Sequence, residues 1–320
     1  MSSWEAMSAA APGVDLSEAV AFLETHFGDR ARDVSALGDG EWSAAFNFRL
    51  DDAERVIRFG QHRDDYEKDR AAMAFAGPDL PVPAVLEIGE ALNGCYAISE
   101  RRHGVFLEEL DEAGCRRALP ALLRGLDAMR VAQAPAGAGC QFVGDGGEPV
   151  TWRQWLLGGL VDLPGGRVSG WRDTLAASVE LEGLFAAGAD AFTSLLGYVP
   201  ECRAVVHSDL INRNVMVTPD GSRLVAIFDW GCATFGDFLY DVAWITFWAP
   251  WFPGLDAVDF LSSVRAHYRT GRVDVVDFDQ RLAAYTLHIG LIHLAYNAFS
   301  DRAQNQDALA VRLRQVLNSL

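Results

Sequence analysis

Residues 205–215 read Val-Val-His-Ser-Asp-Leu-Ile-Asn-Arg-Asn-Val, and residues 227–231 read Ile-Phe-Asp-Trp-Gly. A Pro-Asp-Gly-Ser turn at residues 219–222 predicts a hairpin that joins strands at 215–218 and 224–228. Asp209 and Asn214 then lie on a loop after a third short strand, at 204–206, and the hairpin returns Asp229 beside them. Three side chains with hard oxygen atoms are therefore expected to meet, which is the environment that Mg²⁺ prefers.

The spacing His-x-Asp-x₄-Asn, followed by Asp-Trp-Gly fifteen residues after Asn214, is the arrangement found in kinases. Phosphoryl transfer mainly requires that a hydroxyl, a γ-phosphate and Mg²⁺ are held in line. We expect Asp209 to accept a hydrogen bond from the acceptor hydroxyl and to take its proton, and Asn214 and Asp229 to hold Mg²⁺. A chance match is disfavoured because both motifs occur together around an apolar hairpin. The sequence thus predicts an enzyme that uses ATP or GTP.

The composition favours a globular protein with a cationic partner. Lys and Arg number 27 against 44 Asp and Glu, which gives a formal net charge of -17 that repels nucleic acid and anionic lipid. This charge also has a simpler interpretation, which is solubility. The five cysteines are scattered and form no C-x-x-C pair, and the N-terminus lacks the pattern of a signal peptide. We expect a cytoplasmic protein with no nucleic-acid or membrane partner.

The order of predicted elements indicates an α+β fold with two lobes. A helix at 15–27 precedes strands at 34–37, 45–50, 55–59, 85–88 and 95–99, with one main helix at 64–75. After Gly104 the pattern becomes helical, at 112–132, 151–160, 173–196, 240–248, 258–268, 278–299 and 304–319. We expect a small antiparallel sheet lobe over residues 1–102 that binds the nucleotide, and a larger helical lobe over 103–320 that carries catalysis and the acceptor.

The first lobe offers candidate ligands for the phosphates. A glycine-containing turn at residues 37–46 is placed where kinases cover the phosphates, and its Ser43 hydroxyl is a further donor, although an ordinary hairpin turn is the simpler alternative. The strand at 55–59 offers Arg58 where most kinases have a lysine, and Lys68, the only lysine, belongs to the next helix. We expect Arg58 to pair with Asp69; the alternative is that both are solvated surface charges.

Several stretches of the chain resemble the aminoglycoside phosphotransferases of the protein-kinase-like fold. They are residues 41–48, 56–58, 66–70, 80–90 (Leu-Pro-Val-Pro-Ala-Val-Leu-Glu-Ile-Gly-Glu), 98–105, 151–153, 205–215, 235–237 and 247–251. The resemblance covers most of the chain, and the branch that modifies hygromycin B also has Arg on the third strand. It implies a bilobal fold, a polycationic small-molecule acceptor with hygromycin B as the expected one, and a monomer that confers antibiotic resistance.

The resemblance also implies roles for residues that the motifs alone do not assign. Adenine would be held at the lobe junction near Glu100 and Arg102. His207 would brace the catalytic loop, and Asp237 and Asp241 would orient that loop through hydrogen bonds. Ser208 replaces the arginine of protein-kinase H-R-D, and a helix follows Asp229 too closely for an activation segment, so a small acceptor is favoured over a peptide.

The acceptor pocket is the least defined part of the prediction. Trp248, Trp251 and Trp152 are candidates for stacking on sugar rings, with membership of the helical core as the alternative for each. His288 and His293 lack metal-ligand spacing and are predicted to lie in the core. Two other functions stay open: a kinase of another alcohol, such as a macrolide, choline or a homoserine-like metabolite, and a nucleotide-binding pseudokinase or sensor.

Overall fold

The computed structural model describes residues 13–39, 42–143, 150–300 and 303–320. It divides into two compact units. Unit 1 comprises residues 1–104 and 225–232, and unit 2 comprises residues 105–224 and 233–320. The segment 225–232 therefore groups with unit 1, although the sequence-based boundary after residue 102 assigns it to the second lobe. This segment contains the Asp-Trp-Gly turn.

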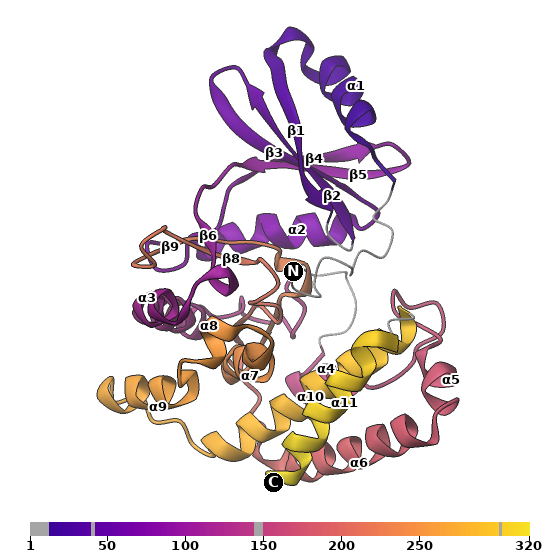
Figure 1. The fold of residues 1–320 in the computed structure, drawn as a ribbon, viewed down its shortest axis with the longest axis vertical. Coiled ribbons are helices and arrows are strands. Elements are labelled where there is room, and N and C mark those ends of the chain that lie inside the picture. The colour runs from indigo at the N-terminus through magenta and orange to yellow at the C-terminus, as the bar shows by residue number, and fades with distance from the viewer. Residues whose placement is uncertain (1–12, 40–41, 144–149, 301–302) are drawn as a thin grey trace. The chain divides into compact units, whose positions relative to one another are not determined.

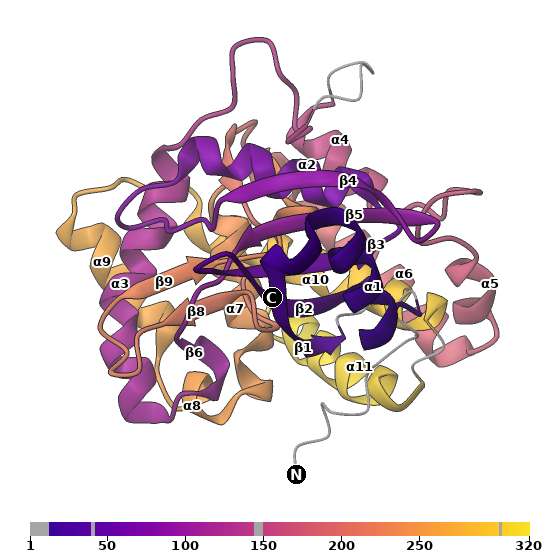
Figure 2. The ribbon, with the colours of Figure 1, turned by 90° about the horizontal axis from the view of Figure 1, so that it is seen from above.

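Unit 1 is built on a five-stranded antiparallel sheet with the strand order β1-β2-β3-β5-β4. Figure 2 shows these strands side by side. Their bounds are β1 (Ala31–Asp39), β2 (Ser43–Leu50), β3 (Ala53–Gly60), β4 (Val85–Ala91) and β5 (Gly94–Glu100). The prediction of a small antiparallel sheet is confirmed, and each strand is longer than its predicted run because the pairing continues beyond that run at one or both ends.

Each face of this sheet packs against one helix (Figure 1). Helix α1 (Leu16–Phe27) begins with a capping box between Asp15 and Glu18 and buries Ala19 and Leu23 against aromatic residues of β2, β3 and β5. Helix α2 (Arg63–Ala72) packs its Tyr66 on the other face. The alternation of side chains along the strands explains this division, since neighbouring residues of one strand face opposite sides.

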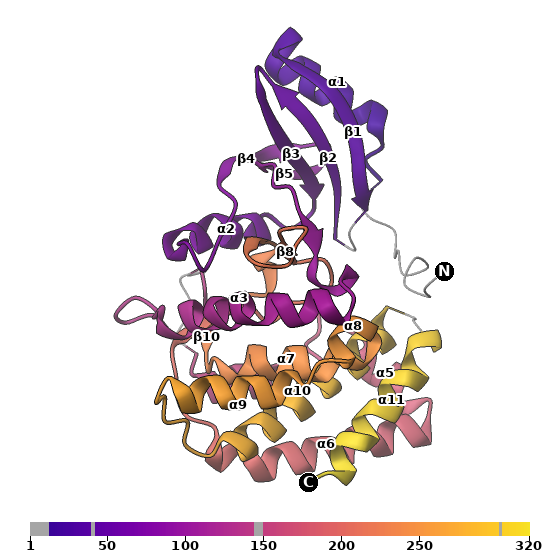
Figure 3. The same cartoon turned by 60° about the vertical axis from the view of Figure 1, so that its left-hand side comes forward.

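Unit 2 is mostly helical (Figure 3). Its helices are α3 (Glu112–Val131), α4 (Trp152–Gly158), α5 (Trp171–Ala176), α6 (Val179–Leu195), α7 (Leu239–Trp248), α8 (Pro253–Asp256), α9 (Phe260–Thr270), α10 (Phe278–Phe299) and α11 (Ala303–Asn318). Short strands β6 (Val105–Phe106) and β8 (Val215–Val217) pair with each other, as do β7 (Ala204–Val206) and β10 (Thr234–Gly236). Strand β9 (Leu224–Ile227) follows β8 through the predicted hairpin turn, and its residues 225–227 belong to unit 1.

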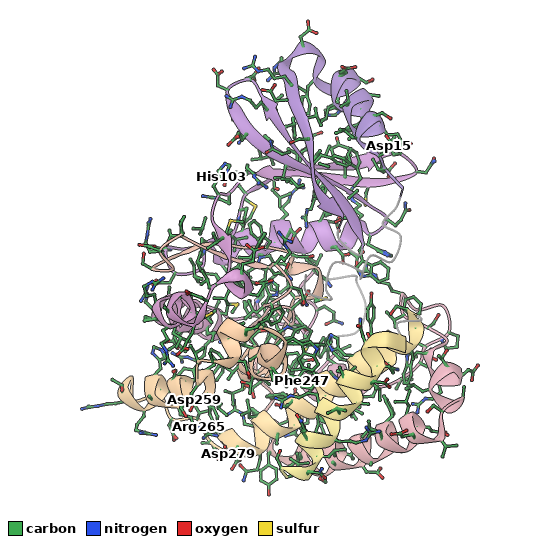
Figure 4. The ribbon with its side chains drawn as sticks, viewed as in Figure 1. Asp15, His103, Phe247, Asp259, Arg265 and Asp279 are labelled. Atoms are coloured by element: carbon green, nitrogen blue, oxygen red, sulfur yellow. The ribbon has the colours of Figure 1, made fainter. Side chains whose placement is uncertain are left out.

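Helix α10 forms the centre of unit 2, because α6, α7 and α11 all pack on it and most of its side chains are buried. A helix that is apolar on nearly all sides is expected to lie in a core. At its first turn, Asp279 forms an ion pair with Arg265 of α9, and Phe247 of α7 lies within the unit (Figure 4).

The structure corrects two details of the helical prediction. The helix predicted at 173–196 is two helices, because the Ser178 side chain accepts a hydrogen bond from the Leu181 amide and begins α6 there. The short helix α8 was not predicted, since four residues are too few to show a helical period. In the described residues, no helix is both long enough and apolar enough to cross a membrane.

Candidate active site

The loop after β7 has an unusual backbone. Ser208, Asn212 and Arg213 have φ angles of 65°, 67° and 66°, in the left-handed region that residues other than glycine rarely adopt. Such residues each cost on the order of 1–3 kcal/mol and persist where surrounding contacts fix them. The hydrogen bonds made by this loop should therefore be the contacts that keep its backbone in the left-handed conformation.

Two amide side chains hold the carboxylate of Asp209. Asn214 Nδ2 donates to the Asp209 carbonyl oxygen at 2.7 Å and to Oδ2 at 3.0 Å, and Asn212 Nδ2 donates to Oδ1 at 2.8 Å. The structure thus brings together two of the three predicted oxygen-bearing residues. Asp209 stays half-buried, whereas Asn214 is only 6% exposed. The carboxylate is fixed in direction but still reachable, as a proton acceptor for a substrate must be.

Asp241 of α7 holds the backbone of this loop through two hydrogen bonds. Its Oδ2 accepts a hydrogen bond from the His207 amide at 2.8 Å, and its Oδ1 accepts one from the Ser208 amide at 2.9 Å. Burial raises the pKa of Asp241 to about 7, although both amide bonds act in the opposite direction. The Asp209 amide donates to His207 Nδ1 at 3.2 Å. His207 and Asp241 thus both contact the loop they were predicted to brace.

Asp237 does not contact the catalytic loop, so the prediction for this residue is wrong. Its carboxylate accepts hydrogen bonds from Arg281 Nε at 2.8 Å and Nη2 at 2.6 Å, and from the Tyr285 hydroxyl at 2.5 Å. Both partners belong to α10. Asp237 is fully buried and joins the start of α7 to α10, which is a role in the core of unit 2.

Glu108 is a loop contact that the sequence did not reveal. Its Oε1 accepts a hydrogen bond from the amide of Arg213, and its Oε2 is buried without a partner among the described residues. Burial raises the pKa of this carboxyl group. The Arg213 guanidinium lies 4.6 Å from the centre of the Phe106 ring and 3.4 Å from Glu109. The only sequence signal was a pair of acids after a short strand, which is a common surface pattern.

Unit 1 holds the remaining charged residues of the predicted site. Arg58 Nη2 and Asp69 Oδ2 form the predicted ion pair, with side chains 19% and 7% exposed. Asp69 Oδ1 also accepts the Trp230 amide at 2.8 Å. Burial alone would lower the pKa of Arg58, but the charges of Asp69 and Asp229 outweigh it and raise that pKa. Arg58 therefore stays charged, whereas burial raises the pKa of Asp69 against the opposing charge of Arg58. The pair anchors the Asp-Trp-Gly turn through the hydrogen bond that Asp69 accepts from the Trp230 amide.

Asp229 begins this turn directly after the β9 hairpin, with a φ angle of 55° and an exposed side chain. Helix α2 holds the turn a second time, because Lys68 Nζ donates to the Gly231 carbonyl oxygen at 2.7 Å. The three predicted oxygen groups therefore fall into two sets: Asp209 with Asn214 in unit 2, and Asp229 with Arg58 and Asp69 in unit 1.

The donor atoms fit a magnesium ion chemically. In unit 2, both hydrogen bonds of the Asn214 amide use its nitrogen, which leaves the oxygen as a ligand. In unit 1, Asp229 has an exposed carboxylate of the kind that Mg²⁺ also prefers. Within the described ranges no group of three or more His, Cys, Asp or Glu side chains could hold a metal. Such a site would accordingly be completed by oxygens of a bound ligand, as Mg²⁺ sites commonly are.

The residues predicted to bind the adenine and the phosphates contact their neighbours in unit 1. Glu100 Oε2 accepts a hydrogen bond from Arg102 at 2.5 Å, and the Glu100 amide donates to the Ala84 carbonyl oxygen at 3.0 Å. Ser43 begins β2 opposite Gly60 of β3. Residues 40 and 41 of the predicted phosphate loop lie outside the described residues.

The structure separates the candidate tryptophans. Trp152 is fully buried, and its indole nitrogen donates to Tyr285 at 3.1 Å, so the prediction that it contacts substrate is wrong. Trp248 and Trp251 are half-buried, with ring centres 5.0 Å apart. His288 is a core residue as predicted and bonds to Tyr240 and Leu156, whereas His293 is only half-buried. Burial lowers the pKa of both histidines to about 4.

The chain is similar in sequence and in structure to enzymes that phosphorylate aminoglycosides. The hygromycin-B 4-O-kinase of Escherichia coli is 32% identical over 284 residues, covering 85% of this chain and 76% of that enzyme. A thermostable mutant of aminoglycoside phosphotransferase APH(4)-Ia, solved with AMP-PNP and hygromycin B, has a TM-score of 0.78 at 29% identity, covering 93% of this chain and 97% of its own.

A more distant structure shares the fold. The GDP complex of aminoglycoside 2'-phosphotransferase-IIIa has a TM-score of 0.63 at 17% identity and covers 96% of this chain and 99% of its own. Residues 33–273, more than half of the chain, match the phosphotransferase enzyme family. This chain therefore belongs to that family: it is a phosphotransferase with the bilobal, protein-kinase-like fold.

Proposed function

We propose that this chain is an aminoglycoside O-phosphotransferase that transfers the γ-phosphate of ATP or GTP to a hydroxyl group of hygromycin B. Relatives at 32% and 29% identity are a hygromycin-B kinase and a phosphotransferase solved with hygromycin B. The observation that carries the proposal is the Asp209 carboxylate, fixed by Asn212 and Asn214 yet half-exposed. A group that is oriented and accessible at once suits proton transfer from a bound alcohol.

Asp209 would accept a hydrogen bond from the acceptor hydroxyl and take its proton as the oxygen attacks the γ-phosphorus. The bond from phosphorus to the bridging oxygen breaks, and the leaving nucleoside diphosphate takes the electron pair. Asn212 and Asn214 keep the carboxylate pointed at the hydroxyl, and the Asp241 contacts hold the backbone that carries Asp209. Positioning of this kind, together with electrostatic stabilisation of the phosphate charges, supplies most of catalysis in phosphoryl transfer.

Asn214 and Asp229 would hold Mg²⁺, which neutralises charge on the phosphate oxygens when bound. Arg58, kept in place by Asp69, would bind the α- and β-phosphates through its guanidinium group. Ser43 would donate to a phosphate oxygen, and the backbone near Glu100 and Arg102 would bind the adenine.

The remaining parts of the proposal concern the acceptor and the setting. Residues 1–102 would bind the nucleotide, and residues 103–320 would carry the catalytic loop and the acceptor site. The half-buried Trp248 and Trp251 are the candidates for stacking on the sugar rings. The protein would work as a monomer in the cytoplasm, where its free cysteines stay reduced.

Expression in a sensitive bacterium tests the proposal. Wild type should raise tolerance to hygromycin B, and Asp209→Asn at the same protein level should not. Nucleotide consumption by the purified protein should then be measured with hygromycin B, a macrolide, choline and homoserine. If the protein consumed nucleotide with a neutral or metabolic alcohol but not with hygromycin B, that alcohol and not the antibiotic would be the acceptor. Nucleotide binding without turnover of any alcohol would instead favour a sensor.

A further inference from the structure

Tyr66 of α2 carries a buried hydroxyl group close to the predicted phosphate-binding residues. The residue is 3% exposed, and its Oη atom has no hydrogen-bond partner among the described residues. Buried tyrosine hydroxyl groups usually bond to a neighbour, because an unpaired polar atom away from water costs free energy. An unsatisfied hydroxyl at this depth therefore points to a partner supplied by a ligand.

The surroundings of this hydroxyl are defined by Gly60 at the end of β3. A Cβ atom added to Gly60 would lie 2.8 Å from Tyr66 Oη, 2.9 Å from the Trp42 carbonyl oxygen and 3.5 Å from Ser43 Cβ. The absence of a side chain at Gly60 thus leaves room for the tyrosine beneath the start of β2. This is the end of the sheet where the predicted phosphate loop rejoins the strand.

The charged groups of the predicted phosphate site lie around the same ring. The Arg58 guanidinium carbon is 5.1 Å from the centre of the Tyr66 ring, and Asp69 lies one turn further along the same face of α2. Asp69 and Asp229 both act electrostatically on Tyr66. Burial raises the pKa of Tyr66, so its hydroxyl stays protonated and can donate a hydrogen bond at physiological pH.

We infer that the Tyr66 hydroxyl donates a hydrogen bond to a phosphate oxygen of the donor nucleotide. The inference rests on the proposed function and adds a third side-chain donor beside Arg58 and Ser43. A phosphate supplies the acceptor atoms that the described residues do not offer to this hydroxyl, and a bond to a charged oxygen is stronger than one between neutral groups. No proton is transferred, so Tyr66 is a binding residue and not an acid or base.

Tyr66→Phe tests the inference, because it removes one oxygen atom and keeps the ring. The affinity for ATP and ADP, measured by calorimetry with Mg²⁺ present, should fall about tenfold or more. The affinity for adenosine, which has no phosphate, should not change. The melting temperature of the free protein should stay the same or rise, since the hydroxyl has no hydrogen bond to a described residue that the substitution could remove.

Tyr268→Phe is the matched control. Tyr268 is also 3% exposed, has a hydroxyl without a partner in the described part of the chain, and lies on α9 in unit 2. This variant should bind ATP and ADP like wild type. Equal affinity of Tyr66→Phe and wild type for ATP would overturn the inference, as would an equal loss for adenosine.

The two proposals can fail separately. Unchanged ATP affinity in Tyr66→Phe, together with transfer to hygromycin B by wild type, would refute only the hydrogen bond. A selective loss of ATP affinity in a protein that never phosphorylates an aminoglycoside would support the hydrogen bond and refute the acceptor.

Discussion

Asp209 is held by contacts that depend on its having two acceptor oxygens. Asn212 donates to one carboxylate oxygen and Asn214 to the other. In Asp209→Asn, one acceptor becomes a donor that faces another donor, and the basic group is lost. We expect phosphoryl transfer to slow by about 10²–10⁴-fold. Single-turnover kinetics should show this loss while calorimetry shows Mg-nucleotide affinity within a few-fold of wild type.

Asn212→Ala is the companion to that experiment. It removes one of the two amides that orient Asp209 but leaves the base itself. A smaller loss of transfer than in Asp209→Asn is expected. Equal losses would show that orientation, and not proton acceptance, is what Asp209 supplies. Full activity in Asp209→Asn would remove the assigned role altogether.

Asp241 makes stability depend on pH. Its pKa is raised from 3.8 to about 7 in the folded protein, so the folded state keeps a proton that the unfolded chain releases. This contribution is complete below about pH 4 and is lost as the pH rises to about 7, with an upper bound of about 4 kcal/mol. Because other carboxyl groups also titrate over this range, the contribution of Asp241 is measured as the difference between wild type and a variant that has no titratable group at this position.

Asp241→Asn isolates the effect, since the amide does not titrate. The variant should be less stable overall, because its nitrogen cannot accept one of the two loop amides. Its unfolding free energy should nevertheless fall less between about pH 4 and about pH 7 than that of wild type. Parallel curves for the two proteins would contradict the raised pKa.

At the scale of elements, two glycines have opposite surroundings. A Cβ atom at Gly236 of β10 would lie 2.3 Å from the Trp152 ring, whereas one at Gly183, exposed within α6, would meet nothing within 4 Å. Gly236→Ala should lower the free energy of unfolding by about 1–3 kcal/mol, because the buried ring cannot move aside freely. Gly183→Ala should raise it by about 0.5–1 kcal/mol.

Thermal unfolding of both alanine variants is the measurement. A pair of melting temperatures that shift in opposite directions is expected, with Gly236→Ala the lower. Equal melting temperatures would mean that Trp152 does not pack tightly against β10, and would reopen the question of whether Trp152 reaches the acceptor.

Periodic patterns in the sequence predict where the helices and strands lie, but they do not predict where each element begins and ends. Alternating apolar residues locate all five strands of unit 1, and the Pro-Asp-Gly-Ser turn locates the β8–β9 hairpin. The break at Ser178 is missed because a serine within a helical pattern is also compatible with a continuous helix. The predictions for Trp152 and Asp237 are wrong because the sequence does not reveal that both side chains bond to Tyr285.

The residues of the candidate site also differ in how well the sequence predicts them. The motif residues could be chosen because their types and spacing have a chemical reason. Glu108 and Tyr66 could not, because the roles of both depend on contacts with residues distant in sequence or on burial. The grouping of residues 225–232 with unit 1 has the same origin: α2 holds this segment through Asp69 and Lys68, more than 150 residues away.

For the whole molecule, the net charge predicts how ionic strength affects binding of the cationic acceptor. A formal charge of -17 attracts a polycation over distances longer than a hydrogen bond, and salt screens that attraction. The KM for hygromycin B should rise several-fold as ionic strength increases from about 0.05 M to about 0.5 M. A kcat that stays constant under the same conditions would assign the effect to binding.

The KM for ATP serves as the internal control in this series. ATP is an anion, so screening should not weaken its binding to an acidic protein in the way that it weakens binding of a cation. A KM for hygromycin B that does not respond to salt would indicate that the net charge serves only solubility.

The central claim is that Asp209 accepts the proton of an aminoglycoside hydroxyl while a nucleoside triphosphate donates its γ-phosphate. The most direct measurement is mass spectrometry of hygromycin B after incubation with the purified protein, ATP and Mg²⁺. We predict that wild type adds one phosphoryl group per molecule and that Asp209→Asn, over the same incubation at the same enzyme concentration, leaves most of the antibiotic unmodified. Unmodified hygromycin B in the presence of active, nucleotide-binding wild type would contradict the account.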